Sequence, residues 1–252
     1  MRRRKFLAGA AALSFGSAKA EILSPGAQAL SGDRFIIGEQ EFILADIMAP
    51  PLYTLSQYPP AYFEQSRSAL QHLFPDAAEI NDALPPTRWN ARVVTVGIRE
   101  SAQTLQERLV QSGAVRVAPQ SGDHEFVKRL YALENVARQN GVGLWSYAAY
   151  RVFDALNAAK SIGDYNLIEG RVVRAEKYGS RFYLNFGDDF KTDFTATATS
   201  TLYRRWVKAG FDLATLKDAT LRVRGYVEPI NGPSIDMKHP LQVELLNVEA
   251  VT

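Results

Sequence analysis

Basic and aromatic side chains are interleaved over a short stretch of the chain in a way that could bind nucleic acid. The residues concerned are Arg171, Arg174, Lys177, Tyr178, Arg181 and Tyr183. Cationic side chains contact phosphates, and aromatic rings stack on the bases of single strands. The same residue types also occur in the core and rim of a small β-barrel, so a structural or protein-contact role stays open. From Gly163 onward, 12 basic and 12 acidic residues balance, which gives this part no net attraction for phosphate.

The other residues that often carry chemistry do not form a recognisable pattern. His72, His124 and His239 are far apart in the sequence and lack a partner at ligand spacing, so no zinc site is predicted. No nucleophile-elbow pattern favours a Ser/His/Asp triad. Asp188 and Asp189 could bind a cation, but a turn between two strands uses the same residues, and we favour the turn.

Composition narrows the class of protein. The chain has 252 residues, no cysteine, 46% hydrophobic and 11% aromatic residues. The absence of cysteine excludes a disulfide-stapled scaffold, a thiolate zinc site, an iron–sulfur site and a cysteine nucleophile. The aromatic content indicates a folded chain, and the length allows one large domain or two of ordinary size.

The first twenty residues have the organisation of a bacterial signal peptide. Residues 2–5 are basic, residues 6–15 are apolar, and residues 18–20 form a small-x-small cleavage site. The apolar stretch is about half the ~20 residues that span a bilayer, so we expect no integral membrane span in the mature chain. Residues 3–7 also resemble a twin-arginine signal, although the general secretion route stays open. We therefore expect a periplasmic or secreted protein.

Removing this segment changes the charge balance. The whole sequence carries 29 Lys and Arg against 27 Asp and Glu, a net charge of +2. Cutting after Ala20 takes away five basic residues and no acidic ones, which leaves 24 against 27 and a net charge of −3. The mildly basic composition is thus a property of the signal and gives no argument for nucleic acid.

Hydrophobic patterns over residues 30–150 predict a strand hairpin followed by alternating helices and strands. Two β-branched runs within residues 34–48 flank a turn at residues 38–40. The other expected elements, in order, are a helix at 61–74, a polar loop containing Pro85 and Pro86, a strand at 92–98, a helix at 103–112, a strand at 114–118, and a helix at 124–140 capped by Asp123.

The remaining sequence predicts a second β-rich domain. Residues 151–163 are alanine-rich and are expected to be a linker, and residues 164–250 form the expected domain. The predicted elements are strands at 165–175, 181–187 and 192–199, a helix at 201–209, and strands at 220–228 and 233–237. Three strands, a helix and two strands is the order of a small Greek-key barrel of the OB type.

Three segments together resemble the staphylococcal-nuclease (thermonuclease-like) family. Residues 32–35 look like the family's Gly-Asp-Thr-hydrophobic turn, and residues 42–51 look like its Arg-Leu-x-x-(Ile/Val)-Asp-(Ala/Thr)-Pro-Glu strand end. Residues 109–117, with the later Gly-Leu-Trp at 143–145, look like its Leu-x-x-x-Gly-x-Ala-x-Val segment and its closing motif. Residues 164–246 resemble an OB-like domain that follows such nuclease domains in some bacterial proteins. The resemblance implies an α+β fold, mainly β with helices, built from two OB-type five-stranded barrels, the first of staphylococcal-nuclease type.

The resemblance also implies a site for phosphodiester hydrolysis, in which calcium, carboxylates, a glutamate and two arginines cooperate. The first carboxylate is present as Asp33, and the second arginine is present as Arg92. The second carboxylate falls on Met48, the first arginine on Ile43 and the glutamate on Pro51. Losing one preorganised donor typically costs ~10²–10³ in rate, and three positions are changed here.

These substitutions predict a catalytically inactive nuclease domain without a cofactor. The protein would then act in binding or scaffolding, with single-stranded nucleic acid or an envelope protein as partner. The alternative is an active, calcium-dependent phosphodiesterase acting on DNA or RNA through Asp33, Arg92 and substitute carboxylates. Glu39, Glu41 and Asp46 are the nearby candidates, but Asp46 is two positions from the required one and the two glutamates belong to a hairpin expected to face solvent.

Overall fold

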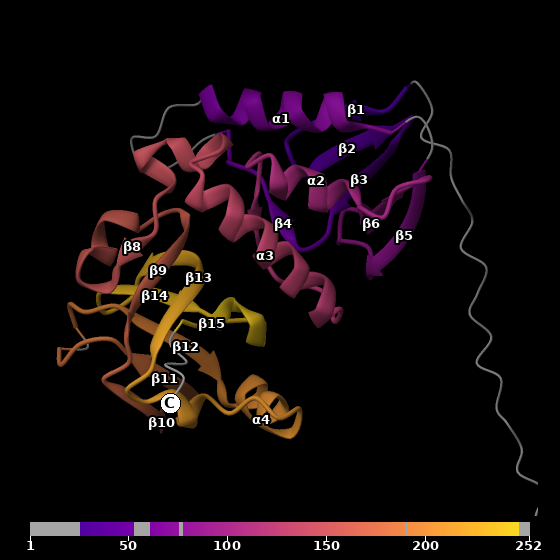
Figure 1. The fold of residues 1–252 in the computed structure, drawn as a ribbon. Helices are drawn as coiled ribbons and strands as arrows, with labels where there is room; N and C mark the ends of the chain where they lie inside the picture. The colour runs from indigo at the N-terminus through magenta and orange to yellow at the C-terminus, as the bar shows by residue number, and fades with distance from the viewer. Residues whose placement is uncertain (1–25, 53–60, 76–77, 190, 247–252) are drawn as a thin grey trace, which may run out of the picture.

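The protein has a mixed α+β fold built around two separate sheets (Figure 1). The computed structural model describes residues 26–52, 61–75, 78–189 and 191–246. The signal peptide expected at residues 1–20 lies outside the described residues. Among those described, no helix combines the length and apolar character that crossing a bilayer requires.

The first sheet has the strand order β1-β2-β3-β6-β5. Its strands are β1 (Gln28–Ala29), β2 (Arg34–Ile37), β3 (Gln40–Leu44), β5 (Ala78–Leu84) and β6 (Arg92–Ile98). β2 and β3 form the predicted antiparallel hairpin, and Gly38 takes a φ of 59° in its turn, where glycine is favoured. β6 covers the predicted strand 92–98 and runs parallel to β3, so the two halves of the sheet meet at this pair.

Three helices cover this sheet: α1 (Ala61–Leu73), α2 (Leu105–Gln111) and α3 (His124–Gln139). They confirm the predicted helices within two residues at each end. Thr104 and Glu107 form a capping box at the start of α2, and the Asp123 carboxylate accepts from Phe126 N at the start of α3. Each cap satisfies backbone N–H groups that have no partner within the helix.

The predicted polar loop between α1 and β6 is partly wrong, because it contains the edge strand β5. Only Ala78 and Ile80 are buried in the first half of this strand, and its register slips between Asp82 and Leu84. The bulge interrupts the alternation of apolar and polar residues by which a half-buried strand is recognised.

A short two-stranded ladder and several helical turns connect the two parts of the molecule. β4 (Ile47–Met48) pairs with β7 (Arg116–Val117), within the predicted strand 114–118. After α3 come the turns η1 (Gly143–Ser146) and η2 (Ala148–Tyr150), the strand β8 (Phe153–Asp154), and the turn η3 (Ala155–Ser161).

The second sheet has eight strands, whereas the sequence analysis expected five. They are β8, β9 (Tyr165–Arg171), β10 (Arg174–Tyr178), β11 (Arg181–Asn185), β12 (Thr195–Thr199), β13 (Thr220–Pro229), β14 (Pro233–Asp236) and β15 (Val243–Leu245). The predicted strand 165–175 is divided, because β9 pairs with β13 while β10 pairs with β11. Only Val172 and Val173 separate β9 from β10, so the sheet bends at this point and curls around its own core.

A helix closes one end of the second sheet. α4 (Ser200–Lys208) follows β12 directly, as predicted, and buries Trp206. The turns η4 (Leu213–Leu216) and η5 (Pro240–Gln242) flank β13 and β14 in the sequence. Figure 1 shows α4, β10 and β11 at the end of the molecule opposite α1.

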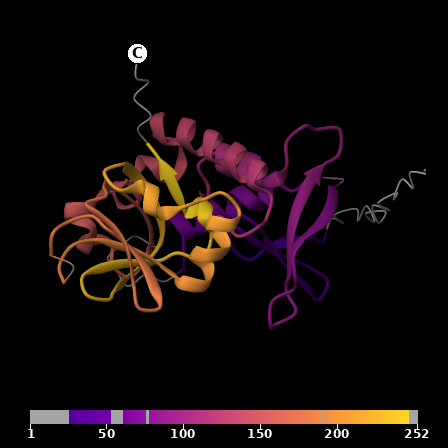
Figure 2. The same cartoon turned by 90° about the horizontal axis from the view of Figure 1, so that it is seen from below.

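α3 lies between the two sheets and joins their cores (Figures 1 and 2). One cluster of buried side chains lies under the first sheet and a second lies inside the curled sheet. A third cluster combines residues of both parts, among them Leu144 and Trp145 from η1 and Tyr165 and Leu167 from β9. The junction between the two parts is therefore itself a packed core.

Candidate functional site: the inherited nuclease positions and the junction

Asp33 forms hydrogen bonds with three segments of the first part of the molecule. One carboxylate oxygen accepts from the Ser31 hydroxyl, and the other accepts from Ala49 N at 3.1 Å. The Asp33 backbone carbonyl accepts from Leu44 N at 2.8 Å. Asp33 thereby ties the turn before β2 to the segment after β4.

The three substituted positions offer no ligand for a hard cation. Met48 is partly buried and packs against the core at the junction. Ile43 lies within the first sheet, between Arg34 of β2 and Val93 of β6, and Pro51 is exposed. Calcium takes six to eight oxygen ligands, so a thioether, an alkyl chain and a pyrrolidine ring cannot replace them.

Arg92 contacts the edge of its own sheet. Its Nε lies 2.9 Å from Asp82 Oδ1, and its guanidinium lies 5.2 Å from the centre of the Phe42 ring. Arg92 and Asp33 thus contact different partners, and the ladder places them beside different residues of β3, Phe42 and Leu44.

The nearby carboxylates do not gather around Asp33. Asp46 is fully buried, takes a φ of 61°, and accepts from Gln120 N at 2.7 Å and from Ser121 N at 2.8 Å. Glu41 pairs with Arg34 at 3.2 Å, and Glu39 is exposed. Within the described ranges, no three His, Cys, Asp or Glu side chains come together in a way that could hold a metal ion. The residues present therefore do not fit the calcium that the family resemblance implies.

Two of the three histidines meet at the junction, although they are far apart in the sequence. The rings of His124 and His239 make an edge-to-face contact at 5.4 Å. His239 Nε2 lies 2.9 Å from Ser121 O, and Nδ1 accepts from Leu241 N at 3.2 Å. Burial lowers the pKa of His239, and His124 lowers it further, while the Ser121 contact and Asp46 act in the opposite direction. Both ring nitrogens are engaged, so this ring fastens the loop before η5 onto the start of α3.

The arginines of the predicted nucleic-acid interface already have acceptors. Arg171 pairs with Asp218 at 3.1 Å, and Arg174 Nη2 donates to Asp188 O at 2.9 Å. Arg181 pairs with Asp236 and also donates to Thr197 Oγ1 at 2.7 Å. These three side chains are therefore tied to the surface of the second sheet.

The other members of the predicted interface divide between the two faces of β10 and β11. Tyr178 pairs with Arg181 in the ladder and is 79% exposed. Tyr183 shares this outer face, because it pairs with Thr197, the acceptor for Arg181. Lys177 pairs with Phe182 and thus lies on the opposite face.

Asp188 and Asp189 form the predicted turn. The Asp193 carboxylate accepts from Asp189 N at 2.9 Å, and Asp189 O accepts from Asp193 N at 2.9 Å. These reciprocal bonds close the loop between β11 and β12.

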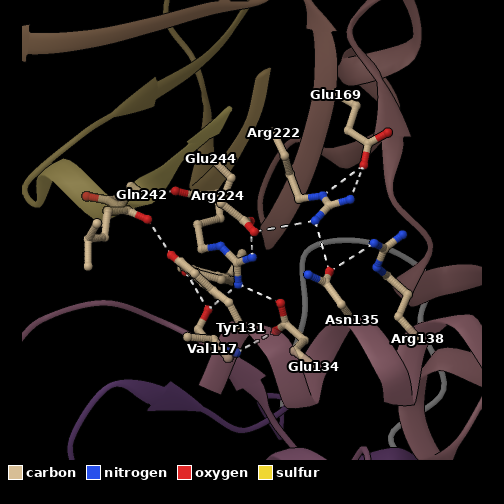
Figure 3. A network of polar contacts seen from close by, with 12 residues as sticks. Val117, Tyr131, Glu134, Asn135, Arg138, Glu169, Arg222, Arg224, Gln242 and Glu244 are labelled. Atoms are coloured by element: carbon tan, nitrogen blue, oxygen red, sulfur yellow. Dashed lines mark hydrogen bonds and ion pairs between the residues drawn. The ribbon is translucent and has the colours of Figure 1, made fainter. Parts of the chain in front are cut away.

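A buried network of charged side chains spans the junction (Figure 3). Arg224 of β13 is fully buried and pairs with Glu134 of α3 at 2.8 Å and with Glu244 of β15. Glu134 in turn accepts from Val117 N at 2.6 Å, and the Arg224 guanidinium lies 4.2 Å from the centre of the Tyr131 ring. Burial opposes the charge on Arg224, but Glu134, Tyr131 and Glu244 outweigh it and hold its pKa well above the usual value.

A second arginine extends this network toward the end of α3. Arg222 Nη2 lies 2.6 Å from Glu169 Oε1, and Nη1 donates to Asn135 Oδ1 at 3.1 Å. Arg138 Nη2 donates to the same Asn135 oxygen at 3.1 Å. Figure 3 shows these side chains reaching toward one another from α3 on one side and β9, β13 and β15 on the other.

The second part also lies close to the segment that carries Met48. Arg116, the ladder partner of Met48, is buried and donates to Asn166 Oδ1 at 3.3 Å. Its guanidinium lies 5.4 Å from the centre of the Tyr165 ring, and burial lowers its pKa. Burial raises the pKa of Tyr226, and the charge of Asp33 adds to this shift against the opposing effect of Arg116. Residues of β9 and β13 thus flank the segment that carries Met48.

One family comparison bears on this arrangement. Residues 41–147 match the family model described as staphylococcal nuclease homologue. The matched segment runs from β3 to η1, and it contains Ile43, Met48, Pro51 and Arg92 but not Asp33. A comparison with curated proteins found no match. The residues after 147, which form the second sheet and half of the junction, lie outside the match.

The sequence analysis missed the junction network. One usable signal is the presence of Arg222 and Arg224 at alternate positions of a predicted strand, which places both on one face. Another is Glu134, which lies among the apolar inward positions of α3. A charged residue at such positions is rarely buried without a partner.

Proposed function

We propose that the protein is exported and that its nuclease-like part is catalytically inactive, so that it acts by binding single-stranded nucleic acid without cleaving it. The observation that carries this proposal is the environment of the inherited site. Met48 packs into the junction core where the resembling family has a carboxylate, and the two carboxylate oxygens of Asp33 accept hydrogen bonds from Ser31 and Ala49. An envelope protein is the alternative partner.

The chemistry of the remaining groups supports this proposal. In phosphodiester hydrolysis, preorganised cations and donors must face the phosphate as its charge develops. Arg92 instead pairs with Asp82, at the edge of the first sheet. Among the described residues, no group of carboxylates is assembled that could hold a metal ion for cleavage.

Nuclease activity is the direct test. The full mature chain and an Asp33→Asn variant are incubated with labelled single-stranded DNA and RNA, once with calcium and once with chelator. Asparagine at position 33 keeps an acceptor for Ala49 N but has no carboxylate charge. Asp82→Asn, which makes the same chemical change at a different carboxylate, is the matched control. We expect the same background cleavage in all samples. Calcium-dependent cleavage that is lost in Asp33→Asn and retained in Asp82→Asn would establish the active enzyme instead.

A further inference from the structure

The helix that closes the second sheet has a strongly basic outward face. α4 exposes Arg204, Arg205 and Lys208, while Trp206 on its inward side is buried. In the part of the chain that the structure describes, none of these three cations lies within ion-pair distance of a carboxylate. Their charge is therefore not compensated within the described protein.

Lys177 extends this basic face onto the neighbouring strand. It pairs across the ladder with Phe182, and the Phe182 ring stacks on Tyr203 of α4 at 4.2 Å between ring centres. Directly opposed residues project from the same face of a sheet, so Lys177 lies on the side that α4 covers. Lys177 is exposed there.

The start of α4 is fixed to the turn between β10 and β11. Ser200 N, at the first position of the helix, donates to Ser180 O at 2.8 Å in the β10–β11 turn. This turn separates Tyr178 from its ladder partner Arg181. We call Lys177, Arg204, Arg205 and Lys208 the α4 basic surface.

The α4 basic surface is held in place by packing and hydrogen bonds. Thr199 caps the helix by accepting from Leu202 N at 3.3 Å, and the Tyr203 hydroxyl donates to Asp212 Oδ1 at 2.8 Å. The Trp206 ring contacts Phe211 with 6.3 Å between ring centres. A preorganised surface pays less ordering entropy when it binds a partner.

Helix stability alone does not account for this arrangement of charge. Cations in the last turn interact favourably with the carbonyl end of the helix, which accounts for Arg205 and Lys208. Arg204, however, is four residues before Lys208, and like charges at this spacing destabilise a helix by a few tenths of a kcal/mol. Asp212, which follows α4, is bonded to Tyr203, and Glu176 lies on the opposite face of β10 from Lys177. An external polyanion would remove this repulsion.

We infer that the α4 basic surface contacts the phosphate backbone of single-stranded nucleic acid. Arg171, Arg174 and Arg181 on the sheet are already tied to acceptors, whereas the α4 cations are free of them in the described structure. A lipid surface fits less well, because the apolar side of α4 is turned inward and cannot enter a bilayer. This inference rests on the proposed binding function and assigns its location.

Salt-dependent binding measures the number of phosphate contacts. The affinity of the mature chain for a labelled oligodeoxythymidylate of about 16 nucleotides is measured by fluorescence anisotropy. For single strands, log K against log salt has a slope of about −0.7 per contact, so the four cations predict about −2.8. Between about 50 and about 200 mM salt the affinity then falls roughly 50-fold.

The test variant carries Arg204→Gln, Arg205→Gln and Lys208→Gln, which preserve helix propensity. We expect its slope to fall to about −0.7, because only Lys177 remains. The control variant carries Arg67→Gln, Lys128→Gln and Lys160→Gln, which remove the same net charge elsewhere, and it should bind like the unmodified chain. Circular dichroism checks that each variant is folded.

The outcomes separate the location from the function. Equal binding by the α4 variant and the unmodified chain would overturn the location and leave the binding function standing. No binding by the unmodified chain, even at low salt, would overturn the nucleic-acid ligand and with it this inference. Binding to vesicles of anionic phosphatidylglycerol in place of the oligonucleotide, lost in the α4 variant, would assign the surface to lipid.

Discussion

At the scale of single residues, the junction depends on charges that are buried. Arg224 is fully buried and meets two glutamates, one from each part of the molecule. An ion pair of this kind costs desolvation free energy and repays it only while every partner is present. The junction is therefore sensitive to the loss of any one member.

Arg224→Ala should lower the free energy of unfolding by about 3–5 kcal/mol, because it leaves the buried Glu134 without its arginine and removes one of the two arginines that pair with Glu244. Arg171→Ala, which breaks an exposed pair with Asp218, should cost less than about 1 kcal/mol. Urea unfolding of both variants measures the two effects. Equal losses would show that the buried network contributes no more than a surface pair.

His239 should make stability depend on pH. Burial lowers its pKa in the folded protein, so the unfolded chain binds the proton more readily. The contribution of His239 is then complete above the ordinary histidine pKa and is lost as the pH falls from there toward the lowered value. His239→Gln should flatten the dependence of the free energy of unfolding on pH in this window, whereas His72→Gln, at an exposed position of α1, should not. An unchanged pH profile in His239→Gln would exclude this role.

At the scale of elements, two glycines of the recognisable motifs form one structural unit. Gly113 follows α2, and Gly143 begins η1, each with a positive φ, 64° and 62°. Leu144 N donates to Gly113 O at 2.8 Å. A Cβ on Gly113 would lie 2.2 Å from Val142 O, and one on Gly143 would lie 2.4 Å from Gly113 O. Gly113 and the Gly-Leu-Trp motif at residues 143–145 are therefore in direct backbone contact with each other.

Gly113→Ala should therefore destabilise the protein well beyond the roughly 1–2 kcal/mol that a left-handed conformation costs an alanine. Gly38→Ala is the matched control, because its φ is 59° and a Cβ there meets nothing within 4 Å. Thermal unfolding of the two variants separates the clash from the conformational cost. Similar melting temperatures would show that the backbone contact adjusts without strain.

Local patterns predict much of the fold but little of the junction. The helices α1 to α3, the β2–β3 hairpin and β6 follow from apolar spacing, caps and a turn glycine, which act within a few residues. β5 is missed because a bulge disturbs its alternation. At the candidate site, the presence of a thioether in place of a carboxylate at Met48 is readable from residue type. The packing of Met48 into the junction core depends on contacts with the second part of the chain, which no local pattern contains.

At the scale of the whole molecule, the charge is unevenly placed although it nearly balances. The second part carries equal numbers of basic and acidic residues. Glu169 and Glu244 pair with arginines at the junction, while Arg204, Arg205 and Lys208 stand exposed at α4. In the described protein, this separation places exposed positive charge at α4, while Met48 packs into the junction core.

The central claim, binding without cleavage, is tested most directly by recovering a bound oligonucleotide. The mature chain is mixed at low salt with an end-labelled single strand and calcium, and the length of the strand in the bound fraction is read on a denaturing gel over time. If the protein binds without cleaving, the strand is retained and stays at full length, as it does in a parallel sample with chelator. Shorter products that accumulate in the calcium sample alone would contradict it.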